Sequence, residues 1–270
     1  AAWEPQSRFD ASPIKTLAER TDAGYRLNGL QELVAGAPGV DALIVSALCE
    51  PSSGAAGDAP QPALFLIEHD TAGLELQSYA MVDGRHAAHV HLKGVTVGAS
   101  ARLAAAPDVM HAIGIAMDHT ILVLCAETIG VMANVLQTTL DYLKQRKQFG
   151  RVLASNQALQ HRLVDMHIAI EETRALVYAA AQAFSGDELQ RCSYVAAAKA
   201  FTSQAARLLW EESVQMHGAI GLTDEYKLGR YVRHLATAHI YFGDFEHHLE
   251  RLAAVEDQLQ ASPLSAGRSA

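Results

Sequence analysis

The feature that most constrains this chain is one long helical repeat that ends in Arg146-Lys147-Gln148-Phe149-Gly150. Apolar residues precede it at spacings of three and four, which are the spacings of one buried helix face. Gly150 is able to end such a helix, and the cationic pair complements the dipole of its last turn. The residues alone therefore predict a helix over about residues 109–148 that ends in a C-terminal cap. The apolar positions are Leu122, Cys125, Ile129, Met132, Leu136, Leu140 and Leu143.

A second stretch, Gln215 to Thr223, closes another long helical pattern. Its sequence is QMHGAIGLT, and it contains small residues at Gly218, Ala219 and Gly221. Small residues allow a ligand to lie directly against the backbone. The stretch therefore predicts a helix end with a possible binding role.

In this order and spacing, the two stretches resemble the signature of the C-terminal helical domain of the acyl-CoA dehydrogenase family. The signature is LKQRKQFG followed about seventy residues later by QMHGAIGLTDEY. Similarity to the family's middle β-domain is carried by AAWEPQ, GYRLNGLQELVAGAPGVDALIVSA and VHLKGVTV. The likeness covers about residues 1–257. It implies an α+β fold, with a small barrel-like or sandwich-like middle domain followed by an antiparallel four-helix bundle, and with the family's N-terminal helical domain absent.

The residue patterns predict the same organisation. Residues 1–106 read as strands, with a hairpin at Asn28-Gly29 and a return strand over residues 30–34. Residues 107–258 read as four long helices with short joints, which favours an antiparallel bundle. The last of these helices is expected from about Gly229 to Asp257, and residues 259–270 are expected to be a disordered tail.

Composition narrows the functional classes. Half of the 270 residues are apolar and 19% are charged, so a sizeable core is possible. No apolar run of about 18 residues lacks charge, so we expect no membrane span. A net charge of −9 with scattered basic residues disfavours nucleic acid as a ligand.

Cys49, Cys125 and Cys192 are far apart and predict reduced residues in a cytoplasmic protein. His89 and His91 share a strand face, but nothing completes a metal site.

The family resemblance implies a catalytic glutamate that removes the α-proton of an acyl-CoA thioester while a hydride leaves to the flavin. The two positions that match the family's locations for this base hold Phe242 and Thr120. Neither side chain is able to act as the base. Asp244 lies two residues from Phe242 and is a candidate for a displaced base, whereas Asp118 and Glu127 are better explained as structural residues.

The resemblance also implies a divided flavin site. Leu33 and Ala35 occupy positions where the family presents a Trp and a Ser or Thr to the flavin ring. In contrast, the residues that family members lend to the FAD of a neighbouring subunit are retained. Arg146 would pair with the pyrophosphate, because a guanidinium binds phosphate oxygens in pairs. The remaining candidates are Gln148 and Phe149 beside it, and Gln215, Gly218, Ala219 and Gly221 at the adenosine end, with Ala219 replacing a usual Gly.

These features predict a subunit of an FAD-dependent acyl-CoA dehydrogenase that lends binding residues to a related partner subunit and lacks its own base. The resemblance implies an acyl-CoA substrate, such as one with a steroid side chain, and an electron-transfer flavoprotein as electron acceptor. Two alternatives stay open: a homomeric dehydrogenase that uses Asp244, and a non-catalytic scaffold subunit. Apolar residues outside the main helix stripes predict an obligate interface. They are Ile121, Val123, Leu124, Val131, Leu235, Ala238, Tyr241, Phe242 and Phe245.

Overall fold

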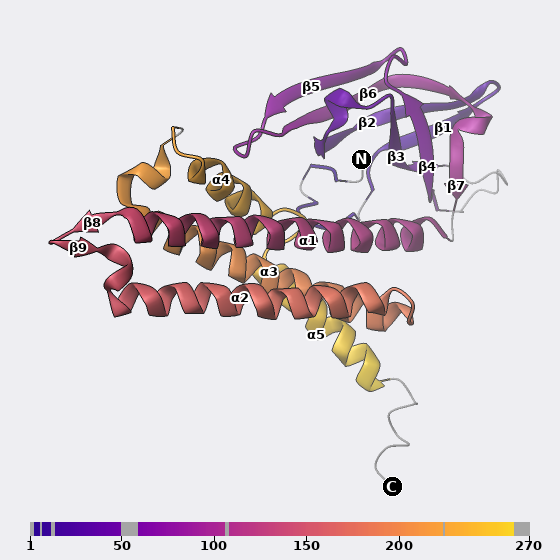
Figure 1. The fold of residues 1–270 in the computed structure, drawn as a ribbon. Helices are drawn as coiled ribbons and strands as arrows, with labels where there is room; N and C mark the ends of the chain where they lie inside the picture. The colour runs from indigo at the N-terminus through magenta and orange to yellow at the C-terminus, as the bar shows by residue number, and fades with distance from the viewer. Residues whose placement is uncertain are drawn as a thin grey trace, which may run out of the picture. The chain divides into compact units, whose positions relative to one another are not determined.

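A computed structural model describes residues 3–5, 7–11, 14–49, 59–105, 108–223 and 225–261. The chain divides into two compact units, Ala1–Ala116 and Met117–Ala270. The first unit contains a sheet and the second contains helices, as the α+β prediction requires (Figure 1). The last strand of the sheet ends at Ala105 and the first helix begins at Asp108, so this helix starts within the first unit.

The first unit is built on one seven-stranded sheet in the order β5-β6-β2-β1-β3-β4-β7. Only the β1–β3 pair is parallel among the described strands. The edge strands β5 and β7 do not pair with each other in the described part of the chain, so the sheet is open and not a closed barrel. The strands are β1 (Leu17–Thr21), β2 (Gly24–Ala35), β3 (Ala42–Cys49), β4 (Gln61–Glu68), β5 (Leu74–Ala80), β6 (His86–Gly98) and β7 (Arg102–Ala105).

The core of this unit follows the two-residue period of its strands. In β4, Ala63, Phe65 and Ile67 are fully buried, whereas Leu66 between them is 41% exposed. Side chains on successive residues of a strand point to opposite faces, so one face of β4 supplies the core. Tyr25 packs edge-on against Phe65, with 5.0 Å between the ring centroids.

The predicted hairpin at Asn28-Gly29 is wrong, because both residues lie inside the twelve-residue strand β2. They pair with Lys93 and Leu92 of β6, and Asn28 Oδ1 accepts a hydrogen bond from the backbone N–H of Gly94. A Cβ on Gly29 would lie 2.3 Å from Oγ1 of Thr16. Glycine is therefore needed at this position for close packing and not for a turn.

The second unit contains most of α1 and the helices that follow it (Figure 1). Its core cluster includes Cys125, Met132, Leu143, Met166 and Leu209, all fully buried. Of the predicted apolar stripe of α1, four residues belong to this buried cluster, which also contains Ile121 and Val135 from outside the stripe. The four are Cys125, Ile129, Met132 and Leu143. The helices are α1 (Asp108–Gln145), α2 (Gln157–Ala183), α3 (Glu188–His217), α4 (Leu228–Ala238) and α5 (Phe245–Ala261), with the 3-10 helix η4 (Gly218–Leu222) between α3 and α4.

The predicted last helix is two helices, α4 and α5, separated by residues 239–244. The break occurs at Phe242 and Gly243, whose φ angles are 60° and 104°. Left-handed backbone cannot continue an α-helix, and helical periodicity does not reveal such a break. Helix α5 also includes residues 259–261, which the sequence assigned to the tail, and residues 262–270 lie outside the described residues.

The apolar residues offered above as an interface are largely used inside the bundle. Ile121 and Leu235 belong to its buried core cluster, and Val131 and Phe242 pack against that cluster. Val123 is the clear exception in this set, at 68% exposed. The excess apolar residues therefore stabilise the bundle itself, and they do not support an interface with another chain.

Helix α1 qualifies the expectation that no segment could span a membrane. Within the described residues it is long and apolar enough to do so, with a mean hydropathy of 1.7 in an 18-residue window. A single helix of this kind is weak evidence, because core helices pass the same test. Asp118 of this helix is fully buried in ion pairs with Arg191 of α3 and Arg251 of α5, which ties α1 to the bundle.

Candidate functional site

The stretch from Arg146 to Gly150 is part of a tight hairpin and is not a helix cap. Helix α1 ends at Gln145, and β8 (Lys147–Gln148) pairs antiparallel with β9 (Arg151–Val152). The two residues at the turn, Phe149 and Gly150, have φ angles of 52° and 78°. Positive φ at both central residues is the requirement of a type I′ turn, in which glycine and asparagine are favoured. Phe149 therefore adopts an unfavourable backbone conformation.

Phe149 is also 98% exposed, the most exposed of the large apolar residues described. A phenyl ring in this position contributes nothing to the core of the chain and costs backbone strain. Strained residues and exposed aromatic residues both concentrate at binding surfaces. The tip of the hairpin is therefore a candidate contact surface.

Arg146 lies at the base of the hairpin, with its backbone held and its side chain exposed. Its N–H donates to the carbonyl of Tyr142 at 2.8 Å, and its carbonyl accepts from the N–H of Leu153 at 2.9 Å. Within the described part of the chain, no hydrogen bond or ion pair engages its guanidinium. The hairpin thus presents a fixed cation to solvent, whereas the amide of Gln148 donates to the carbonyl of Lys147.

The second stretch presents exposed backbone at the end of α3. Gly218 caps α3 with φ 68° and ψ −150°, a conformation that is essentially restricted to glycine. No atom lies within 4 Å of the position that a Cβ would take there. Gln215 and Ala219 are exposed. Gly221 differs, because it is buried and a Cβ would lie 3.1 Å from Cβ of His217, so its role is packing.

The structure brings the two stretches together through Tyr142 of α1 and His217 of α3. Their rings stack at 4.3 Å between centroids with 25° between the planes. The hydroxyl of Tyr142 donates to the carbonyl of His217 at 3.3 Å. Tyr226 packs edge-on against Tyr142 and completes the aromatic cluster. Arg146 and Gly218 each lie within four residues of this contact, so both candidate surfaces belong to one end of the bundle.

His217 is neutral in this cluster. Burial lowers its pKa, and the hydrogen bond between Nδ1 and the carbonyl of Ser213 opposes that shift. Because a carbonyl only accepts, the proton of the neutral ring is on Nδ1. Nε2 is then an acceptor, and it is buried without a hydrogen-bond partner among the described residues. A buried acceptor of this kind is unusual in a native protein.

The two residues that the family resemblance predicts at the base positions, Thr120 and Phe242, carry no carboxylate. Thr120 is exposed on α1, and Phe242 is half-buried against the bundle core. Asp244, the candidate for a displaced base, accepts a hydrogen bond from the N–H of His247 at 2.9 Å. This is the contact of a residue that caps the start of a helix, here α5.

The other carboxylates considered from the sequence also have structural contacts. Asp118 is enclosed by two arginines, as described above. Glu127 lies 3.8 Å from Nε2 of His234 on α4. Within the described ranges, no group of three His, Cys, Asp or Glu side chains is arranged to hold a metal ion.

Leu33 and Ala35, expected at the flavin ring, lie at the end of β2 in the sheet unit and are exposed. Leu33 has a φ of 51° where the register of β2 against β6 shifts, so it lies at a β-bulge. These two positions are assigned by counting from a hairpin expected at Asn28-Gly29, but Asn28 and Gly29 lie within strand β2. Their assignment to the flavin ring stays a prediction.

Lys199 is a residue that sequence reasoning missed. Its side chain is fully buried, and its ammonium donates three hydrogen bonds, to Oγ of Ser203 and to the carbonyls of Ala238 and Gly243. Burial lowers its pKa to about 8. The sequence contains a signal for a buried lysine, because Lys199 within AAAKAF interrupts a run of small residues that packs closely.

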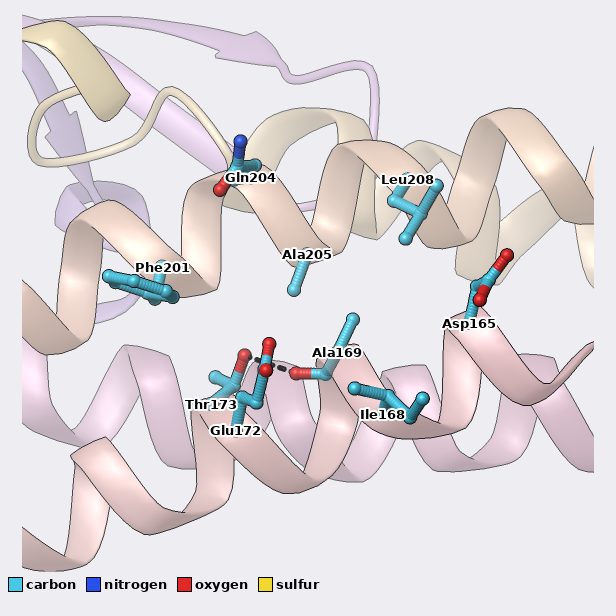
Figure 2. A pocket seen from close by; sticks show the side chains of 9 residues that line it. All are labelled: Asp165, Ile168, Ala169, Glu172, Thr173, Phe201, Gln204, Ala205 and Leu208. Carbon is cyan, nitrogen blue, oxygen red and sulfur yellow. Dashed lines mark hydrogen bonds between the residues drawn. The ribbon is translucent and has the colours of Figure 1, made fainter. Parts of the chain in front are cut away.

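A groove of about 360 Å³ lies between α2 and α3 (Figure 2). Ile168, Asp165 and Glu172 line it from α2, and Phe201 and Gln204 from α3. The hydroxyl of Thr173 is used within α2, where it donates to the carbonyl of Ala169 at 2.7 Å. The groove contains none of the predicted site residues.

Comparison with known proteins agrees with this description. The family described as "Acyl-CoA dehydrogenase, C-terminal domain" matches residues 110–256. An acyl-CoA dehydrogenase of Bacillus subtilis is 28% identical over 249 residues, which cover 91% of this chain and 64% of the relative. The chain thus spans less than two thirds of that relative's length.

Two solved structures show the same fold. Butyryl-CoA dehydrogenase from Megasphaera elsdenii is 27% identical with a TM-score of 0.84, covering 94% of this chain and 66% of that one. The ChsE4-ChsE5 complex from Mycobacterium tuberculosis is 26% identical with a TM-score of 0.78, covering 94% of this chain and 65% of that one. The fold, the matched helical domain and the two adjoining signature stretches together show that this chain belongs to the acyl-CoA dehydrogenase family.

Proposed function

We propose that this chain is a subunit of an FAD-dependent acyl-CoA dehydrogenase that lends FAD-binding residues to a related partner subunit and supplies no catalytic base. The observation that carries the proposal is the end of the bundle where the hairpin and the α3 terminus meet. The cation of Arg146 and the exposed backbone at Gly218 lie there. Within the described residues, the guanidinium of Arg146 has no hydrogen-bond or ion-pair partner.

The residues at this end fit the phosphate and adenosine parts of FAD. The guanidinium of Arg146 is fixed through its backbone and exposed, which suits a pyrophosphate. The backbone at Gly218 and Ala219 is open to close approach, and Gln215 beside it offers an amide. Gly221 contributes through packing under that backbone. FAD, when bound, supplies the acceptor for the hydride that leaves the substrate.

The hairpin tip supports the view that a second chain completes the site. Phe149 adopts a strained conformation and is nearly fully exposed, so its own chain gains no stability from it. Gln148 and Phe149 are therefore proposed to contact the partner or its flavin. The ChsE4-ChsE5 structure is a complex of two different chains, which favours a heteromeric assembly of this kind.

The absence of a carboxylate at Phe242 and Thr120 supports the proposal that the partner subunit supplies the catalytic base. A partner with glutamate at either position would act on the α-proton of an acyl-CoA. Asp244 is a weaker alternative, because its carboxylate caps α5. An acyl-CoA substrate with a bulky chain such as a steroid side chain, a cytoplasmic location and an electron-transfer flavoprotein as electron acceptor complete the proposal.

The test is flavin retention in the partnered complex. The chain is co-expressed with a related chain that carries the glutamate, and the FAD content is measured from visible absorbance after dialysis. Arg146→Ala should weaken FAD binding about ten- to a hundred-fold, as the loss of a charge-assisted phosphate contact predicts.

Lys144→Ala is the matched control, because Lys144 is an exposed cation in the last turn of α1. Its FAD content should equal that of the wild type. Equal occupancy in the Arg146→Ala complex would show that the stretch serves only the fold, which would favour the non-catalytic scaffold.

A further inference from the structure

The connection between α4 and α5, residues 239–244, is hydrogen-bonded by the buried ammonium of Lys199, which belongs to α3. Nζ of Lys199 donates to the carbonyl of Ala238 at 3.2 Å and to the carbonyl of Gly243 at 2.7 Å. One carbonyl belongs to the last residue of α4, and the other belongs to Gly243 within the connection. The last carbonyls of a helix lack intrahelical partners and carry partial negative charge, so a cation is favoured there.

The backbone of this connection requires such support. Phe242 and Gly243 are both left-handed, and a Cβ on Gly243 would lie 2.6 Å from Nε2 of His248. That same nitrogen is 2.7 Å from the carbonyl of Phe242. Because the carbonyl accepts, Nε2 donates. Lys199 from α3 and His248 from α5 thus donate hydrogen bonds to the adjacent carbonyls of Gly243 and Phe242.

The third partner of the ammonium is Oγ of Ser203, one turn along α3, at 2.8 Å. Ser203 is 1% exposed and Lys199 is fully buried. All three contacts of the ammonium are neutral oxygens. The titratable groups around it are Cys125 of α1, Asp244 of the connection and His248 of α5, and no carboxylate is hydrogen-bonded to it within the described residues.

We infer that Lys199 and Ser203 form a latch that holds the α4–α5 connection in both protonation states of the lysine. The ammonium donates all three hydrogens, to Ser203 and to the two carbonyls. When one proton leaves to solvent, the neutral amine keeps two N–H donors and gains a lone pair. The carbonyls only accept, so they retain the two donors. The hydroxyl of Ser203 rotates and donates to the lone pair, and all three contacts are preserved.

A serine is suited to this role because its hydroxyl both donates and accepts. Burial lowers the pKa of Lys199 to about 8, so both protonation states are populated near neutral pH. Without Ser203, the ammonium would have one buried N–H without an acceptor, and the neutral amine would have a buried, unpaired lone pair. Either condition costs free energy. The latch therefore depends on both Lys199 and Ser203 in either protonation state of the lysine.

The experiment measures hydrogen exchange of the backbone amides of residues 239–248 in the full chain. Protection factors, which correct for intrinsic exchange rates, are compared at pH 7 and pH 9.5. We expect the wild type to keep its protection within about threefold. Ser203→Ala should lose about tenfold at both pH values, because one buried group is unpaired in either protonation state of Lys199. Lys199→Met should lose protection at both pH values.

Ser213→Ala is the matched control, because Ser213 is a fully buried serine of α3 that donates to the carbonyl of Trp210. It should behave as the wild type at both pH values. Protection in Ser203→Ala that equals the wild type at either pH value would overturn the role of Ser203, and loss of protection in the wild type at pH 9.5 would overturn the latch. If Lys199→Met does not fold, the comparison of wild type with Ser203→Ala still decides the inference.

Discussion

The ring of Tyr142 at the end of α1 stacks on the ring of His217 at the end of α3, and its hydroxyl donates to the His217 carbonyl. Tyr142 directly precedes one signature stretch, and His217 lies in the other, about seventy positions later in the sequence. Their contact places the hairpin that contains Arg146 beside the exposed backbone at Gly218. One aromatic pair therefore assembles the surface that we propose for FAD.

Removal of this pair should loosen the proposed surface. Tyr142→Ala should lower the free energy of unfolding by about 2–4 kcal/mol, because an aromatic stack and its packing are lost. Tyr142→Phe keeps the ring and loses only the hydrogen bond, so about 1 kcal/mol or less is expected. Chemical denaturation of both variants measures the difference. Equal stability of the two variants would contradict the importance of the stack.

The isolated chain should contain little or no FAD and should not oxidise an acyl-CoA. The reasons are Thr120 and Phe242 at the base positions, and Leu33 and Ala35 at the predicted ring contacts. The chain is expressed alone, and its visible spectrum is recorded before and after addition of an acyl-CoA. A yellow protein with one FAD per chain that bleaches on addition of substrate would favour the homomeric alternative with Asp244.

Phe149→Asn should separate stability from assembly. Asparagine tolerates a positive φ and is preferred beside glycine in a type I′ turn, so the isolated chain should become more stable by up to about 1 kcal/mol. No packing is lost, since the ring is 98% exposed. Association with the partner should weaken, because an aromatic anchor is removed. Thermal unfolding of the chain and titration with the partner measure the two effects, and a variant that binds the partner as well as the wild type would refute the contact.

His248 should make the bundle sensitive to acid. Burial lowers its pKa to about 3, despite the opposing hydrogen bond with the Phe242 carbonyl. The unfolded chain, with an ordinary histidine pKa near 6.5, takes up the proton first as the pH falls. The free energy of unfolding should therefore fall below pH 6.5, by about 2 kcal/mol between pH 6 and pH 4.5. Denaturation at both pH values is the measurement.

The variant His248→Gln isolates this effect from other groups. Glutamine does not titrate and is able to donate to the same carbonyl, so the variant should lose about 2 kcal/mol less than the wild type over that interval. His217, whose pKa burial also lowers, contributes in the same direction in both proteins and cancels in the comparison. Identical pH dependence of the two proteins would show that His248 is not buried in neutral form.

The sequence by itself determined the fold class and the family. The three- and four-residue spacing along α1 reflects burial on one face, and the same residues, such as Met132 and Leu143, lie in the core. The start of α3 depends on a contact of the same local kind, because the side chain of Asp187 accepts from the N–H of Gln190 as a capping residue does. Such signals are local, since they depend on residues within one or two turns of each other.

Only the tertiary structure decided the features that depend on contacts between distant segments. Asn28-Gly29 resembles a turn, but pairing with β6 and the proximity of Thr16 keep it within a strand. The break at Phe242 and Gly243 is stabilised by Lys199, more than forty residues earlier. The Tyr142–His217 stack likewise joins separate helices. In each case a long-range hydrogen bond or packing contact outweighs a local preference of about 1 kcal/mol, and no local pattern reports such a contact.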